Sequence, residues 1–313
     1  MKGLDLARAY FEQCGKAMLE TEFSKVLPFL AIGLVGSGSE CYGYDDEISR
    51  DHDFEPGFCI FLPEESVVDS RTAFLLERAY AKLPKEFMGF KRSPINPVGG
   101  KRHGVICMED FFLEKVGSAD GKLSLEQWFS LPEYGLLEAT NGEVFCDPFG
   151  KFSAIRERLH YLPEDVRLKK LAGRLLLMGQ AGQYNYNRCV KRGETAAAQL
   201  GVFEFVQSAI HSIYLLNRKY MPYYKWSFRG LKELQFGKEL AEDLEYLLTT
   251  ANTEKEVIKK AEIIESVCKT FADELRAREL TQLNGAEMEV LAYSVNDKIK
   301  DGNIRTLHIL QGV

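Results

Sequence analysis

The sequence predicts an α+β protein: a mixed sheet with helices comes first, and an all-helical bundle follows. Short apolar runs of strand length alternate with amphipathic segments as far as residue 150. From Pro163 onward the apolar residues recur at helical intervals, and no run has the length and composition of a strand. The composition changes near residues 160–164, so we expect one domain at residues 1–162 and another at residues 163–313.

The first domain is expected to open with a helix over residues 4–20, where apolar residues recur at near-helical spacing. An apolar strand at 29–35 leads to a turn at 36–43 that runs into a short helix, and a second strand follows at 53–62. Pro63 and the two acids after it are typical of a helix start, which predicts a helix to about residue 83.

The rest of the first domain is less regular. Residues 84–102 are rich in Pro, Gly, Lys and Arg and are predicted to form a loop. The remaining predicted elements are a strand at 103–108, helices at 109–116, 124–130 and 132–139, an Asn141-Gly142 turn and a strand at 143–146.

The second domain is predicted from the spacing of its apolar side chains. One amphipathic helix carries Leu168, Leu171, Leu175, Leu176 and Met178. Further helices are expected at 196–217, 237–250, 253–280 and 285–300.

Composition and charge exclude several classes of protein. The formal net charge is −6 and there is no strongly basic block, which argues against broad, non-specific binding of nucleic acid. No apolar run approaches the roughly 20 residues that span a bilayer, and Asp5, Arg8 and Glu12 interrupt any signal-peptide core. Seven scattered cysteines without CxxC spacing fit buried thiols in a reducing compartment. We therefore expect a cytoplasmic protein without membrane association.

Two carboxylates, Asp51 and Asp53, precede the second predicted strand. Side chains alternate between the faces of a strand, so these two are expected to point the same way. Adjacent carboxylates suit Mg²⁺ or Mn²⁺, which also contacts the phosphates of a substrate. Asp51 and Asp53 are therefore the predicted metal ligands, and the simpler alternative is a pair of solvated acids at a strand end.

A Gly36-Ser37-Gly38-Ser39 turn follows the first predicted strand. It is not a dinucleotide fingerprint, because Cys41 stands where the third glycine belongs, and no Gly-Lys-Ser/Thr follows as in a P-loop. Hydroxyls and backbone N–H groups of such a turn hold phosphates. Gly36, Ser37 and Ser39 are therefore candidate nucleotide-binding residues, and the alternative is an ordinary glycine turn.

A strand that ends in Gly-Ser, followed by Asp-x-Asp before the next strand, resembles the DNA polymerase beta-like nucleotidyltransferase superfamily. The helical second half is similar in layout to the kanamycin-type nucleotidyltransferases. Two strings, residues 183–188 (QYNYNR) and 216–226 (LNRKYMPYYKW), also resemble an uncharacterised bacterial family of nucleotidyltransferase-like proteins. The resemblance implies that Gly36 and Ser37 hold a nucleoside triphosphate, while Asp51 and Asp53 bind Mg²⁺.

The same resemblance implies a third acid on a later strand, as a metal ligand or as the base for the acceptor hydroxyl. The strand at 103–108 carries apolar residues where this acid is expected. Glu109 and Asp110 follow immediately, and either is a candidate catalytic acid. Both also suit the start of the next helix, which is the commoner role of acids at such positions.

Aromatic and basic residues of the second half form another candidate group. Tyr184, Arg188 and Lys225 are proposed to reach a nucleotide, the cations through its phosphates and a tyrosine through its base. The alternative is that most of the aromatic side chains belong to the bundle core.

The sequence thus favours a Mg²⁺-dependent nucleotidyltransferase that moves a nucleoside monophosphate from an NTP to a hydroxyl acceptor of unknown identity. Two alternatives stay open. One is a catalytically degenerate protein of the same fold that binds or senses a nucleotide, and the other is an antitoxin-like partner. A third carboxylate beside Asp51 and Asp53 would discriminate the enzyme from both.

Overall fold

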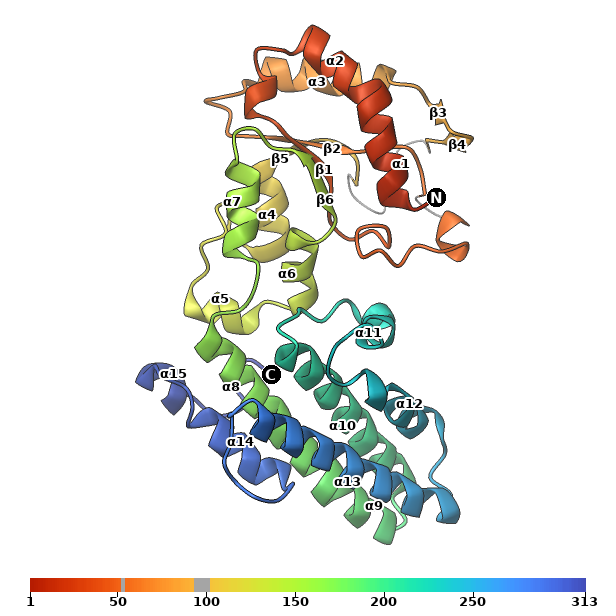
Figure 1. The fold of residues 1–313 in the computed structure, drawn as a ribbon, viewed down its shortest axis with the longest axis vertical. Coiled ribbons are helices and arrows are strands. Elements are labelled where there is room, and N and C mark those ends of the chain that lie inside the picture. The colour runs from red at the N-terminus through yellow and green to blue at the C-terminus, as the bar shows by residue number, and fades with distance from the viewer. Residues whose placement is uncertain (52–53, 93–101) are drawn as a thin grey trace. The chain divides into compact units, whose positions relative to one another are not determined.

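The protein combines a small mixed sheet, covered by helices, with a helical bundle (Figure 1). The predicted α+β class is confirmed. The computed structural model describes residues 1–51, 54–92 and 102–313, without the side chains of Arg50 and Asp51.

The chain divides into two compact units. The first comprises residues 1–123 and 131–160, and the second comprises residues 124–130 and 161–313. The sequence predicts a boundary after residue 162, whereas the chain enters the second unit after His160. The short helix at 125–130 also belongs to the second unit, because Phe129 packs beside Lys170 and Gly312.

The sheet of the first unit has four strands in the order β5-β2-β1-β6. Their bounds are β1 (Ala31–Leu34), β2 (Cys59–Leu62), β5 (Gly104–Cys107) and β6 (Glu143–Cys146). β1 is antiparallel to β2 and to β6, while β2 and β5 run parallel. A parallel pair requires a long crossover connection, and here that connection includes a helix, α3.

Helices cover both faces of this sheet (Figure 1). They are α1 (Gly3–Tyr10), α2 (Lys16–Glu22), α3 (Ser70–Lys82), α4 (Met108–Val116), α6 (Glu133–Thr140) and α7 (Lys151–Arg158). Ile60 of β2 shares a core with Leu19 of α2 and Leu76 of α3. The next residue, Phe61, faces the other way and stacks on Phe152 of α7 with ring centroids 4.2 Å apart.

The predicted opening helix forms, with one irregularity in its middle. A π-helical segment, η1 (Phe11–Gly15), joins α1 to α2. A Cβ atom at Gly15 would lie 2.3 Å from the ring of Phe58, so glycine is needed for the close approach of helix and sheet. Hydrophobic spacing does not reveal such an insertion, because the pattern on either side stays helical.

The second strand is shorter than predicted, which changes the argument for Asp51. β2 begins only at Cys59, and Asp51 ends a 3₁₀ helix, η3 (Ile48–Asp51). The alternation of side chains along a strand therefore does not apply to Asp51. Pro56 has no N–H for a ladder, which disfavours an earlier start of the strand. Asp53 lies outside the described residues.

Three further predictions in the first unit need correction. Helix α3 begins at Ser70 rather than at Pro63, because the Asp69 carboxylate accepts the N–H of Thr72 at 2.7 Å and caps it. The turn after Gly36 does not run into a helix, since residues 38–44 form hydrogen-bonded turns only. The segment predicted as a loop contains a two-stranded ribbon of β3 (Glu86–Phe87) and β4 (Phe90–Lys91). Short 3₁₀ segments also occur, η2 (Leu27–Phe29) here and η5 (Lys238–Leu240) in the second unit.

The second unit is helical, and residues 163–313, all of which are described, contain no strand. Its helices are α5 (Leu125–Ser130), α8 (Glu164–Met178), α9 (Asn187–Lys191), α10 (Thr195–Leu216), α11 (Tyr224–Leu231), α12 (Ala241–Thr249), α13 (Glu254–Ala277), α14 (Met288–Asn296) and α15 (Gly302–Thr306). A π-helical segment, η4 (Gly179–Tyr186), joins α8 to α9. The five apolar residues predicted to mark α8 are all buried. Among the described residues, no helix is both long and apolar enough to cross a bilayer.

Buried cations on α8 are a feature that the hydrophobic pattern does not predict. Lys169 is fully buried, and its ammonium donates to Asn296 Oδ1 at 2.7 Å, to the Arg305 carbonyl at 3.0 Å and to the Leu307 carbonyl at 2.9 Å. Burial lowers its pKa. Lys169 therefore ties the C-terminal segment to α8 through neutral acceptors, without an ion pair.

We expect Lys169→Met to lower the free energy of unfolding by on the order of 2 kcal/mol, because it leaves three acceptors without their charged donor. Lys255→Met is the matched control: Lys255 is exposed on α13, and its loss should cost less than about 0.5 kcal/mol. Urea denaturation of both variants checks this, and equal midpoints would contradict the role given to Lys169.

Candidate functional site

The candidate site begins where β1 ends. Gly33 brings β1 against β6 so closely that a Cβ there would lie 2.4 Å from the Glu143 carbonyl oxygen. Gly36 has a φ of +118°, a conformation that L-residues rarely adopt, and the chain turns there away from the sheet. The predicted Gly36-Ser37 turn therefore forms just after the end of β1.

A second turn, Asn141-Gly142, holds this loop. The Gly36 N–H donates to Asn141 Oδ1 at 2.9 Å, and Asn141 Nδ2 donates to the Gly36 carbonyl at 2.8 Å. The Gly142 N–H donates to the Cys41 carbonyl at 3.0 Å. Both ends of the loop are thus fixed by one turn, about 100 residues later in the chain.

Between these anchors lies a run of unpaired backbone donors. In the described part of the chain, the N–H groups of Ser37, Gly38, Ser39 and Glu40 have no acceptor. The following donors are used within the turn, since the N–H groups of Cys41 and Tyr42 bond to the Gly38 carbonyl. Successive free N–H groups form a concave partial positive charge, which is the arrangement that binds anions.

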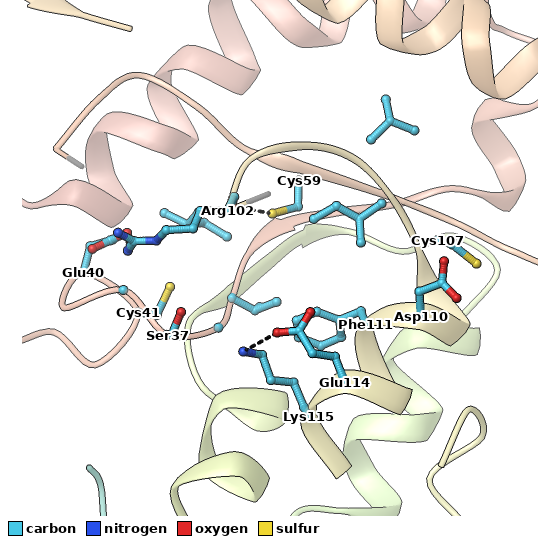
Figure 2. Close-up of a pocket in the computed structure, with 16 residues that line it drawn as sticks. Ser37, Glu40, Cys41, Cys59, Arg102, Cys107, Asp110, Phe111, Glu114 and Lys115 are labelled. Carbon is cyan, nitrogen blue, oxygen red and sulfur yellow. Dashed lines mark hydrogen bonds and ion pairs between the residues drawn. The ribbon is translucent and has the colours of Figure 1, made fainter. Parts of the chain in front are cut away.

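The loop lines a cavity of about 280 Å³ (Figure 2). The cavity is built from the loop, from the start of β2 and the end of β5, and from the first two turns of α4. Its lining residues are Leu34, Val35, Gly36, Ser37, Gly38, Glu40, Cys41, Cys59, Arg102, Val105, Ile106, Cys107, Asp110, Phe111, Glu114 and Lys115. Its size is at the lower end of the range for small-molecule sites.

Two ion pairs lie on the wall of the cavity. Arg102 Nη2 is 2.8 Å from Glu40 Oε1, and the Glu40 side chain is nearly buried. This pair crosses the loop at Gly38, where a Cβ would come within 2.2 Å of both side chains. Lys115 Nζ lies 3.2 Å from Glu114 Oε1 and 3.0 Å from Glu138 Oε2. Figure 2 shows the two pairs at separate places on the wall.

The environment of Lys115 keeps its charge. Burial on its own lowers the pKa of Lys115, but the hydrogen bond and charge of Glu138, together with Glu114, raise it above the usual lysine range. The Tyr42 hydroxyl donates to the other oxygen of Glu138 at 3.1 Å, and burial followed by the Glu138 charge raises the pKa of Tyr42. Lys115 is therefore a cation and Tyr42 a neutral phenol at neutral pH.

Asp110 differs from the other acids of the cavity. It lies in the first turn of α4, is exposed, and has no hydrogen-bond or ion-pair partner among the described residues. Glu109, the other candidate, is half-buried and does not line the cavity. β5 itself carries no acid, as its sequence indicates. Of the two candidates, only Asp110 lines the cavity.

Three cysteines also line the cavity, which sequence reasoning did not foresee. Burial raises the pKa of Cys41 and raises that of Cys59 to about 12, so both thiols are neutral at physiological pH. Cys59 Sγ donates to the Arg102 carbonyl at 3.2 Å. The buried thiols expected from the sequence are thus part of the cavity wall, with the half-buried Cys107 beside them.

The other predicted site residues are placed as follows. Ser39 is half-buried on the loop but does not line the cavity, and its hydroxyl lies 3.5 Å from Glu40 Oε2. The side chains of Asp51 and Asp53, the predicted metal ligands, lie outside the described residues. Among the side chains that are described, no group of three or more His, Cys, Asp or Glu residues has the arrangement of a metal site.

The candidate residues of the second unit do not form one group. The guanidinium of Arg188 lies 4.7 Å from the ring centre of the exposed Tyr184, and Lys225 Nζ lies 5.2 Å from that of Trp226. The segment before Arg188 packs on the Phe205 side of α10.

Helix α11, which carries Lys225, adjoins the Phe203 side of α10 across a small apolar pocket. Phe203 and Phe205 point in directions that differ by roughly 200° around a helix. Lys225 is therefore not brought to Tyr184 and Arg188.

A comparison with known families finds one match. The family model for a domain of unknown function (DUF4037) matches residues 128–227, less than half of the chain. The matched segment begins in α5 and ends in α11, so it includes Asn141 and Tyr184 but not the Gly36-Ser37 loop. No match was found among curated proteins or among solved structures.

We expect Gly142→Ala to destabilise the protein more than Gly193→Ala does. Both glycines have left-handed φ angles, +63° and +74°, so each substitution costs about 1–2 kcal/mol in backbone strain. Only at Gly142 would the new Cβ also lie 2.1 Å from the Leu34 carbonyl oxygen, whereas nothing lies within 4 Å at Gly193. That clash should add about 2 kcal/mol. Urea denaturation measures both losses in the free energy of unfolding. Equal values would contradict the close contact between Gly142 and the Leu34 carbonyl.

Proposed function

We propose that the protein is a Mg²⁺-dependent nucleotidyltransferase that moves a nucleoside monophosphate from an NTP to a hydroxyl acceptor. The observation that carries the proposal is the pairing of two features on one cavity. The loop whose N–H groups from Ser37 to Glu40 have no acceptor lines the same cavity as Asp110, a carboxylate without a partner among the described residues. A polyanion bound through a divalent cation needs both features.

In this proposal the loop holds the terminal phosphates of the triphosphate. The Ser37 hydroxyl and the free N–H groups supply the donors. Lys115 is a charged neighbour on the same wall, already shared between Glu114 and Glu138. The loop therefore binds phosphate through dipoles, and the remaining negative charge of the ligand calls for a metal ion.

Asp51 and Asp53 would hold that Mg²⁺ ion, as the sequence predicts, and Asp110 would add one oxygen ligand or act as the base. The metal would offset charge on the phosphates. The acceptor oxygen attacks the α-phosphorus as the bond to the bridging oxygen of the β-phosphate breaks, and pyrophosphate leaves with that electron pair. The acceptor proton passes to Asp110 or to water.

The cellular setting is part of the proposal. All seven cysteines are free, and three of them line the cavity, which suits a reducing cytoplasm where nucleoside triphosphates and Mg²⁺ are available. The resemblance to the polymerase beta-like superfamily supports the same reading. Tyr184, Arg188 and Lys225 lie in the second unit and do not line this cavity, so the proposal assigns them no role.

One observation favours a second candidate function, a nucleotide-binding protein without turnover. Glu40 and Glu114 are both committed to ion pairs, so Asp110 is the one cavity acid left without a cation among the described residues. A site whose loop has unpaired N–H donors, but in which few acids are outside ion pairs, suits binding better than catalysis. Sensing of a nucleotide or an antitoxin-like partnership would follow from such binding.

We expect MgATP, or another of the four common NTPs, to raise the melting temperature of the protein. With the nucleotide about 100-fold above its Kd the rise should be about 5 °C or more. Asp51→Asn combined with Asp53→Asn should remove the Mg²⁺-dependent part of this shift, while Asp297→Asn, an exposed acid of the second unit, should leave it intact. No shift with any NTP would count against both candidate functions.

Pyrophosphate release separates the enzyme from the binding protein. We expect Asp110→Asn to lower the rate of release by at least about 100-fold, because it removes a metal ligand or base. Glu109→Gln should change the rate by no more than about twofold, since Glu109 does not line the cavity although it is the neighbouring residue on the same helix. The reverse result would assign the catalytic role to Glu109. Release by neither the wild type nor the variants, despite a thermal shift, would support binding alone.

A further inference from the structure

The Asn141 side chain makes a two-bond clamp on Gly36. Its Oδ1 accepts the Gly36 N–H at 2.9 Å and its Nδ2 donates to the Gly36 carbonyl at 2.8 Å. The carboxamide thus replaces the strand neighbour that a backbone would offer beyond the end of β1. Asn141 does not line the cavity, so any effect on a ligand passes through the loop.

Asn141 is itself held in place from behind. Its N–H donates to the Leu137 carbonyl at 2.7 Å, at the end of α6, and its carbonyl accepts from Arg156 Nη2 at 2.8 Å. Arg156 also donates to the Thr140 carbonyl at 2.7 Å. Burial lowers the pKa of Arg156 to about 10, so it is still charged at neutral pH. The backbone of Asn141 is therefore fixed by the end of α6 and by a charged donor, so its side chain can hold Gly36 in one orientation.

The clamp lies at one end of the free N–H groups. Gly142 holds the other end through its bond to the Cys41 carbonyl. Between the two anchors, the N–H groups of Ser37 to Glu40 are unpaired in the described part of the chain. Donors whose orientation is fixed before binding cost less ordering entropy when an anion arrives.

We propose that Asn141 is the positioning residue of this loop: it orients the four N–H groups for a polyphosphate that it never touches. That the ligand is a polyphosphate rests on the proposed function, but the control of the loop by Asn141 does not. Asn141 fixes Gly36 at its left-handed φ and thereby the direction in which the next peptide groups point.

Only a side chain with both a donor and an acceptor can hold Gly36 in this way. An ionised carboxylate has the shape of the carboxamide but accepts only. In Asn141→Asp one oxygen would therefore face the Gly36 carbonyl without a proton between them. The substitution keeps volume and shape, and it changes the clamp from two bonds to one bond and one repulsion.

The chain contains a matched control. Asn217, at the end of α10 in the second unit, makes the same two-bond clamp on Phe236. Its Nδ2 donates to the Phe236 carbonyl at 2.9 Å, and its Oδ1 accepts the Phe236 N–H at 3.1 Å. Asn217→Asp therefore makes the same chemical change in a clamp that borders no part of the cavity.

The experiment compares wild type, Asn141→Asp and Asn217→Asp by amide hydrogen exchange and by calorimetric titration with inorganic tripolyphosphate in the presence of Mg²⁺. We expect Asn141→Asp to speed exchange at the hydrogen-bonded amides of residues 36–42, which are those of Gly36, Cys41 and Tyr42, by about tenfold or more. We also expect it to raise the tripolyphosphate Kd by about tenfold or more. Asn217→Asp should speed exchange around Phe236 and change the Kd by less than about twofold.

Two results would overturn the proposal: unchanged exchange at residues 36–42 in Asn141→Asp, or an equal rise in Kd for both variants. The outcomes also distinguish this proposal from the proposed function. If wild type and Asn141→Asp bind tripolyphosphate equally well, the positioning role falls and the proposed function stands. If the wild type binds neither tripolyphosphate nor any NTP, the proposed function falls, and exchange at residues 36–42 alone decides whether Asn141 holds the loop.

Discussion

The pair of hydrogen bonds between the Asn141 carboxamide and the backbone of Gly36 is the constraint on which the candidate site depends. It joins the end of the first strand to the end of α6, next to the N–H groups of Ser37 to Glu40, which have no acceptor in the described chain. Both turns require glycine. Gly36 has a φ of +118°, and a Cβ at Gly142 would clash with the Leu34 carbonyl oxygen. A loop with free donors would otherwise gain stability by folding back on itself.

Charge in the cavity is balanced locally. Arg102 is paired with Glu40, and Lys115 with Glu114 and Glu138, so neither cation faces the cavity with its full charge uncompensated. A polyanionic ligand must therefore break an ion pair or arrive with its own cation. The second course costs less, because separating a half-buried pair leaves an isolated charge out of water. In the proposed function, this balance is the reason why a polyphosphate would bind together with a divalent cation.

The second unit uses its polar residues mainly to hold its helices together. Gln183, within the π-helical segment, donates to Glu265 and to the Ala286 carbonyl and accepts the N–H of Met288. The buried Tyr186 donates to Asn252, which also accepts from the buried Lys260. Part of the string that resembles a bacterial family is thus structural. Tyr184, Asn185 and Arg188 are its exposed members.

Strand and helix positions followed from the sequence wherever burial alone decides them. The helices near 109–116 and 196–217 are examples, because a period of 3.6 in apolar residues survives any tertiary arrangement. The strand at 143–146 was also predicted, although its residues are only half-buried. The true start of α3 also has a local signal in the sequence, the capping residue Asp69. The prediction instead followed Pro63 and the two acids after it, which are also typical of a helix start. The start of β2 was predicted too early, although Pro56, which has no N–H for a ladder, lies within the predicted strand at 53–62. The Gly36-Ser37 turn could be predicted because glycine and serine directly after an apolar run are typical of a turn. Its clamp, the selection of Asp110 over Glu109, and the ion pairs that neutralise Arg102 and Lys115 were decided by the tertiary structure alone. Hydrogen bonds and charges between distant segments leave no periodic trace in a sequence, so only the folded chain brings such partners together.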